Sequence, residues 1–156
     1  MKNLLLLVFF IATPILLIKS MEAGPAPELR PAVWVNPPAA KSLAELDGEV
    51  VLVEFWATWC PPCRQSMPHL DQIHRRYKGR GLKVMSISDE PVDVVRDFVR
   101  RHKLSFPIAA ECISAQDYGV KGIPRAFLVG RDGDIVWEGH PMDPAMEVAI
   151  QDELAN

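Results

Sequence analysis

Two cysteines, Cys60 and Cys63, with two residues between them, stand between an apolar run and a helical pattern. The run, residues 50–55, is rich in β-branched residues and has the length of a buried strand. In residues 65–77, apolar side chains recur at helical spacing. The pair is therefore predicted where a strand leads into a helix. A helix N-terminus stabilises a thiolate, so this pair is suited to attack a disulfide, hold a mixed disulfide and then close on itself.

The same spacing also occurs in zinc sites, haem attachment sites and short structural disulfides. A structural zinc site needs four ligands, and the third cysteine and the four histidines do not stand at zinc-ribbon spacing. Covalent haem attachment needs a histidine after the second cysteine, where this chain has Arg64. A disulfide that closes so short a loop constrains the unfolded chain little. We therefore predict a redox-active Cys60/Cys63 disulfide, no metal and no other cofactor.

The two cysteines are assigned different roles. Cys60, at the predicted exposed start of the helix, is the nucleophile, and Cys63, one turn further in, is the resolving thiol. Pro61 and Pro62 have no N–H group, so two potential donors to the Cys60 thiolate are missing. A less stabilised thiolate gives a less oxidising couple, which favours a reductase over an oxidase.

Glu54 is the acidic residue of the apolar run. Burial of an unpaired carboxylate is costly and raises its pKa, which suits a group that accepts the proton of Cys63. The alternative is a glutamate that reaches solvent or pairs with a buried lysine.

Two tryptophans and one further cysteine complete the candidate residues. Trp59 is predicted to cover the reactive sulfur and to form part of the substrate surface, together with Pro61 and Pro62. Trp56 is predicted to lie in the core. Cys112 is the odd cysteine, and it can be buried, pair with another chain or act as a regulatory thiol. We favour a small, partly buried residue.

The residues around the two cysteines resemble those of a known protein family. Residues 53–64, VEFWATWCPPCR, and the Met-Pro pair at 67–68 resemble the active-site segment of thioredoxin-like proteins of the TlpA/ResA type. The resemblance continues through Gly-Ile-Pro at 122–124 and residues 127–133. It implies a thioredoxin fold and thiol-disulfide exchange outside the cytoplasm.

The resemblance also implies roles for single residues. Glu54 occupies the place of the buried acid, which in the family is mostly Asp or Asn. Ile123 and Pro124 match the position of a cis-proline beside the disulfide, which leaves the backbone of Ile123 free to pair with an extended substrate. Arg125 stands where the family usually has Thr, which suggests a more anionic partner.

The rest of the chain supplies the elements that must position this site. Residues 82–88 are predicted as a strand and 91–102 as an amphipathic helix. Residues 127–129 and 135–137 are predicted as a hairpin, and a last helix begins after Asp143. Alternating strands and helices imply a parallel pair with right-handed crossovers. We predict an α/β thioredoxin fold with a mixed sheet and helices on both faces.

Length and charge restrict the function. The chain has 156 residues and a net charge of −3, which fits one domain and argues against nucleic-acid binding. We divide it into an N-terminal signal or membrane anchor (1–23), a proline-rich linker (24–40) that can add a short edge strand at 33–35, and the thioredoxin-like domain (41–156).

The N-terminus indicates the compartment. A short basic start precedes a largely apolar run at 4–18, as in a secretory signal. As a helix the run spans about 22 Å, less than the roughly 30 Å of a bilayer core. Both a cleaved signal and an uncleaved membrane anchor therefore stay open. Either places the domain outside the inner membrane, in the periplasm or another extracytoplasmic compartment.

These observations predict a thiol-disulfide oxidoreductase that reduces protein disulfides with electrons from a membrane donor. By resemblance, its substrates include apocytochromes c or other exported redox proteins. The alternatives are a disulfide oxidase, a peroxidase, and a non-enzymatic redox sensor or copper chaperone, since thiolates suit Cu(I).

Overall fold

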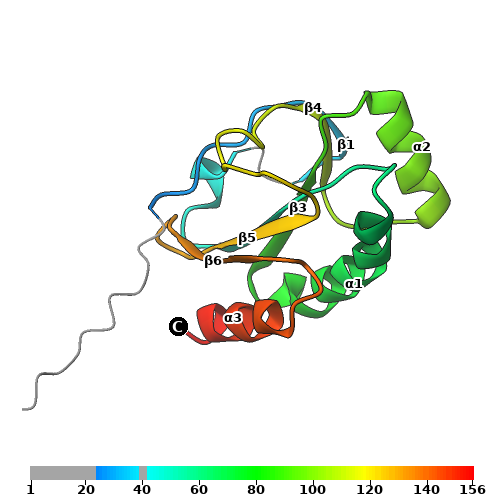
Figure 1. Cartoon of the computed structure of the whole chain (residues 1–156). Helices are drawn as coiled ribbons and strands as arrows, with labels where there is room; N and C mark the ends of the chain where they lie inside the picture. The colour runs from blue at the N-terminus through cyan, green and yellow to red at the C-terminus, as the bar shows by residue number, and fades with distance from the viewer. Residues whose placement is uncertain (1–23, 39–41) are drawn as a thin grey trace, which may run out of the picture.

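One strand of the sheet leads directly into the cysteine motif. The computed structural model describes residues 24–38 and 42–156. Over these residues the elements are β1 (Pro31–Asn36), η1 (Ala44–Leu46), β2 (Val50–Phe55), α1 (Pro61–Tyr77), η2 (Lys78–Arg80), β3 (Leu82–Ile87), α2 (Val92–His102), β4 (Ile108–Cys112), β5 (Arg125–Val129), β6 (Ile135–Gly139) and α3 (Pro144–Ala155) (Figure 1). The elements η1 and η2 are 3-10 helices.

The strands form a six-stranded mixed sheet in the order β1-β4-β3-β2-β5-β6. β2, β3 and β4 run parallel, and β1, β5 and β6 pair antiparallel with their neighbours. The predicted mixed sheet, parallel pair and C-terminal hairpin are confirmed. β4 was not predicted because its sequence, IAAEC, has neither an alternating pattern nor a run of β-branched residues.

The three α-helices all pack toward one face of the sheet (Figure 1). Two successive right-handed crossovers lead from β2 to β3 and from β3 to β4 in the same direction, so α1 and α2 lie on the same side. The opposite face is covered by η1, by the segment before β1 and by the loop at 113–122. The thioredoxin-like fold is thus as predicted, but on this second face the expected helix is only the three-residue η1.

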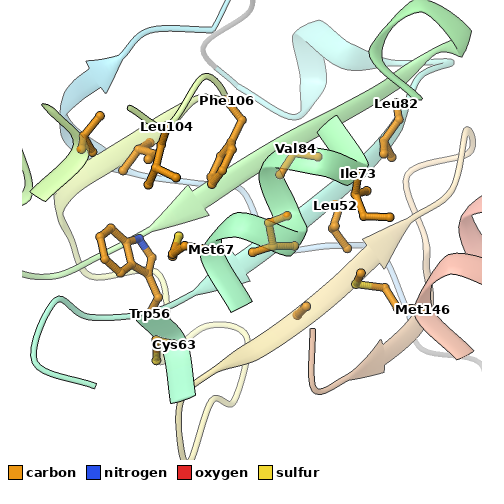
Figure 2. Close-up of a cluster of buried hydrophobic side chains, with 14 of the residues drawn as sticks. Leu52, Trp56, Cys63, Met67, Ile73, Leu82, Val84, Leu104, Phe106 and Met146 are labelled. Atoms are coloured by element: carbon orange, nitrogen blue, oxygen red, sulfur yellow. The ribbon is translucent and has the colours of Figure 1, made fainter. Parts of the chain in front are cut away.

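β2 is buried along its whole length and separates the two halves of the core. Because side chains alternate along a strand, Val50 and Leu52 belong to the cluster with the α-helices, whereas Val51 and Val53 belong to the other. Figure 2 shows the first cluster, including Leu52 of β2, Met67 and Ile73 of α1, Val84 of β3 and Met146 of α3. Glu54 continues the Val50 and Leu52 side of β2, which faces α1.

The proline-rich segment differs from the linker that we expected. The predicted edge strand is confirmed, because β1 pairs with β4 over its length. Leu29 is 4% exposed and packs in the second cluster, and the N–H of Ala26 donates to the carbonyl of Gly133 at 2.9 Å. Prolines remove donors but permit an edge strand, so residues 25–36 can be rich in proline and still join the sheet.

The N-terminal signal or anchor, residues 1–23, lies outside the described residues. Within residues 24–38 and 42–156, every helix is too short or too polar to span a membrane.

Candidate functional site

The two motif cysteines form a disulfide at the first turn of α1. Cys60 is the N-cap residue, and its Cα lies 5.3 Å from that of Cys63. Pro61 and Pro62 occupy the first two helical positions, where proline is well tolerated because those N–H groups have no partner within the helix. The first N–H that reaches the sulfur is that of Cys63, which donates to Cys60 Sγ at 3.3 Å. The helix therefore directs one backbone donor at the sulfur that was assigned as the nucleophile.

Cys60 is more enclosed than we expected. Its residue is 3% exposed and Cys63 is fully buried. The neighbouring Trp59 is 69% exposed, so the surface beside the pair is apolar and open to solvent. The role predicted for Trp59 as part of the substrate surface stays a prediction. Trp56 is buried against Phe98 with ring centroids 5.0 Å apart, as expected for a core residue.

The loop before β5 reaches the same sulfur. The peptide bond between Ile123 and Pro124 is cis, as the resemblance implied. The carbonyl oxygen of Ile123 lies 3.9 Å from Cys60 Sγ. Pro124 is buried and Ile123 is half-buried, so the structure brings these two residues together with the cysteine pair.

Arg125, which suggested a more anionic partner, pairs with an acidic residue of the chain. Its Nη2 donates to Glu138 Oε1 at 2.7 Å across the β5–β6 pair. Both side chains are partly exposed. Because the charge of Arg125 already faces a carboxylate, it gives little support to an anionic substrate.

Glu54 is a fully buried acid on the α1 side of β2. Ser86, its register partner on β3, donates its hydroxyl to Glu54 Oε2 at 2.5 Å. Oε1 has no hydrogen-bond partner among the residues that the structure describes. Burial raises the pKa of Glu54 to about 8, and the hydrogen bond from Ser86 offsets part of that rise. Among the described residues, Glu54 neither reaches solvent nor pairs with a lysine, which were the alternatives considered for it. With a pKa near neutral pH, the carboxyl can take up and release a proton.

Cys112 lies behind the exposed tryptophan. It is 1% exposed, and its Sγ is 3.3 Å from Ser114 Oγ. Together with Trp59 and Ile123 it lines a cavity of about 250 Å³, whose other walls include Phe55 and Ile87. This is more complete burial than the partly buried residue that we favoured.

One contact near the pair was not found from the sequence. Thr58, two residues before Cys60, is bound through its backbone N–H and its hydroxyl to the carboxylate of Glu90, at 2.6 and 2.7 Å. Glu90 stands 32 residues further along the chain in an irregular connection, and no local pattern marks it as a partner of Thr58. The described residues contain no group of three or more His, Cys, Asp or Glu side chains placed to hold a metal ion.

Comparison with known proteins gives a family and several relatives. The model of the AhpC/TSA family matches residues 36–138. A curated relative, thiol-disulfide oxidoreductase ResA of Halalkalibacterium halodurans, is 38% identical over 99 residues, which cover 60% of this chain and 55% of the relative. The chain thus spans just over half the length of the curated relatives it matches.

Solved structures share the architecture over nearly their whole length. A thiol:disulfide interchange protein of the thioredoxin family from Chlorobium tepidum is 25% identical, with a TM-score of 0.68, and the match covers 85% of this chain and 99% of that one. A thiol-disulfide isomerase from Corynebacterium glutamicum has a TM-score of 0.76 at 22% identity, covering 86% and 97%, and this second likeness supports the fold alone.

Proposed function

The chain belongs to the AhpC/TSA family, and from this premise we propose that it is a thiol-disulfide oxidoreductase that reduces disulfides in protein substrates. The observation that carries the proposal is the Cys60–Cys63 disulfide at the N-terminus of α1, within reach of the Ile123 carbonyl. The relatives named above as thiol-disulfide oxidoreductase and interchange protein support it.

The reaction proceeds in two exchange steps. In the reduced protein the Cys60 thiolate attacks one sulfur of a substrate disulfide, the substrate S–S bond breaks, and its other sulfur leaves as a thiolate that takes up a proton. The Cys63 thiolate then attacks Cys60 Sγ. This step forms the Cys60–Cys63 bond and releases the second substrate sulfur as a thiol. Two electrons pass to the substrate, and the protein ends as the disulfide.

Glu54 serves the second step. A buried carboxylate on the α1 side of β2, with a pKa of about 8, can accept the proton that Cys63 loses before it attacks. Trp59 and the backbone of Ile123 contact the substrate segment that carries the disulfide, because both border the same cavity and the Ile123 carbonyl lies 3.9 Å from Cys60 Sγ.

Trapping tests this function. Cys63→Ser cannot carry out the second step, so mixed disulfides on Cys60 should accumulate with protein substrates. They should be absent from the matched variants Cys60→Ser and Cys60→Ser/Cys63→Ser. Recovery of no Cys60-linked protein from intact cells, with the variant folded, would remove protein disulfides as the substrate class. The same trap addresses apocytochromes c and other exported redox proteins, which we propose as substrates.

We further propose that the domain acts outside the cytoplasm, attached to the inner membrane or secreted, and receives electrons from a membrane donor. The basic start and apolar run of residues 1–18 support the location. The membrane donor follows from the location, because exposed dithiols in an oxidising compartment are oxidised unless a donor reduces them. A fusion of residues 1–40 to a reporter that is active only after export should be active. An inactive, stably expressed fusion would contradict the location without affecting the chemistry.

A further inference from the structure

The loop that carries Cys60 is held by a carboxylate from another element. Thr58 lies between β2 and α1, and Glu90 lies in the connection between β3 and α2. The N–H of Thr58 donates to Glu90 Oε2 at 2.6 Å, and its hydroxyl donates to Glu90 Oε1 at 2.7 Å. One residue thus occupies both oxygens of one carboxylate. Such charge-assisted bonds are roughly twice as strong as neutral ones.

Glu90 is itself fixed on the scaffold. The hydroxyl of Ser88 donates to Glu90 Oε2 at 3.1 Å. The N–H of Glu111 donates to the carbonyl of Glu90 at 3.1 Å, and Glu111 Oε1 in turn accepts from the N–H of Val92 at 3.3 Å. The backbone of Glu90 is therefore tied to β4 through Glu111, and its carboxylate is tied to Ser88, which directly follows β3, so Glu90 can hold Thr58 in place.

The rest of the Cys60 loop has few other ties. The N–H of Trp56 donates to the carbonyl of Ile87 at 3.1 Å, and the N–H of Cys60 donates to the carbonyl of Ala57 at 3.2 Å. The second of these bonds lies within the loop and does not attach it to the sheet. Among the described residues, the loop between Trp56 and α1 is joined to other elements by the contact of Cys60 Sγ with the Ile123 carbonyl and by the two hydrogen bonds from Thr58 to the Glu90 carboxylate.

We infer that Glu90 is a positioning residue that holds Cys60 in the geometry of the closed disulfide and so favours the disulfide over the dithiol. A disulfide forms only when the two sulfurs lie close together. A fixed loop raises the effective concentration of one sulfur at the other, because less conformational entropy is lost when the bond forms. A couple whose reduced form is disfavoured is the stronger reductant.

This inference rests on the proposed function and gives its direction a structural cause. The measurement is the equilibrium between the protein dithiol plus oxidised glutathione and the protein disulfide plus two molecules of reduced glutathione. All proteins carry Cys112→Ala, so only one couple is followed. Each variant is first checked for folding by circular dichroism and thermal unfolding.

Five variants separate the contributions of the carboxylate and the hydroxyl. Glu90→Ala should lower the equilibrium constant for disulfide formation by about tenfold, since bonds to a charged group are lost, and Thr58→Val should lower it by about threefold. Thr58→Ser keeps the hydroxyl and should restore the parent value. Glu90→Gln removes the charge but keeps one acceptor, and its constant should lie between those of the parent and Glu90→Ala. Asp93→Asn removes an exposed charge from the first turn of α2 without touching Thr58 and should change nothing.

The outcomes are distinguishable. A folded Glu90→Ala protein whose equilibrium constant stays within about twofold of the parent overturns the inference, because the contact then has only a structural role. If Glu90→Ala does not fold, equal constants for Thr58→Val and Thr58→Ser overturn it instead. If the parent protein itself shows no reversible couple, the proposed function fails, whatever the variants do.

Discussion

The surroundings of two residues, Glu54 and Cys60, determine what chemistry the site can perform. Glu54 is placed in a fully buried position with one hydrogen bond, from Ser86. Cys60 is placed between a helix terminus and the Ile123 carbonyl. The proposed proton acceptor, Glu54, and the proposed nucleophile, Cys60, are thus held by different strands and loops, so each can be changed without the other.

Glu54→Gln should slow resolution of the mixed disulfide by about 10²-fold, within the range of general-base contributions. In the parent protein the resolution rate should rise with pH until Glu54 is ionised, near its pKa of about 8. In the variant the rise that follows Glu54 ionisation should be absent, so that the resolution rate depends only on the ionisation of Cys63 itself. Stopped-flow measurement of the second step between pH 6 and 9, with a substrate linked to Cys60, checks this. Equal rates in both proteins across that range would remove Glu54 from the mechanism.

The raised pKa of Glu54 also predicts how the stability of the protein depends on pH. Its folded pKa of about 8 lies above the ordinary value of 4.5, so between these pH values the folded state binds more protons than the unfolded state. The free energy of unfolding should therefore fall as pH rises from about 4.5 to about 8, by an amount on the order of 4 kcal/mol. In Glu54→Gln this decline should be absent. Urea unfolding at pH 5, 6.5 and 8 measures it, and parallel profiles for the two proteins would contradict the burial of an unpaired acid.

At the scale of elements, the N-terminus of α1 sets the stability of the thiolate. Because Pro62 lies in the first turn and lacks an N–H, Pro62→Ala restores one donor near Cys60. The reduced protein should then hold a more stable thiolate, so the Cys60 pKa should fall and the couple should become more oxidising by severalfold in its glutathione equilibrium. Thiolate absorbance near 240 nm against pH gives the pKa. As a control, Gln72→Ala changes an exposed residue in the middle of α1 and should leave both values unchanged.

The sequence predicts the local elements of the site but not the contacts between elements that are distant along the chain. The strand-to-helix position of the cysteines follows from local periodicity, and the cis bond at Pro124 follows from the resemblance. Local patterns could not reveal that Thr58 meets Glu90, because that contact depends on how the β3–α2 connection folds back to the β2–α1 loop. They also could not reveal β4, whose small residues become a strand because β1 and β3 pair on either side of it.

At the scale of the whole molecule, residues 26–34 contribute side chains to the second core cluster. Leu29 is 4% exposed there, so Leu29→Ala should lower the free energy of unfolding by about 2–5 kcal/mol. Arg30→Ala, which removes only an exposed ion pair with Asp117, should lower it by about 1 kcal/mol or less. Urea unfolding compares the two. If both variants match the parent protein, residues 25–36 act as the linker that their composition suggested.

The proposed function makes the whole molecule a carrier of two electrons between a donor and a protein disulfide. Composition predicted one domain without nucleic-acid binding, and the fold agrees with the family match over residues 36–138. The burial of the proline-rich segment could not be predicted, because prolines mark extended chain but not whether that chain finds an edge to pair with.

The central claim is that Cys60 and Cys63 form a reversible and reducing couple. Its most direct test is the reduction potential of the pair, measured in Cys112→Ala by equilibration with glutathione buffers followed by alkylation. We predict a value near that of thioredoxin, about −270 mV, as expected for a reductase supplied with electrons. A value near about −120 mV, as in a strong oxidant, would contradict the direction, and the absence of any reversible couple would contradict the function itself.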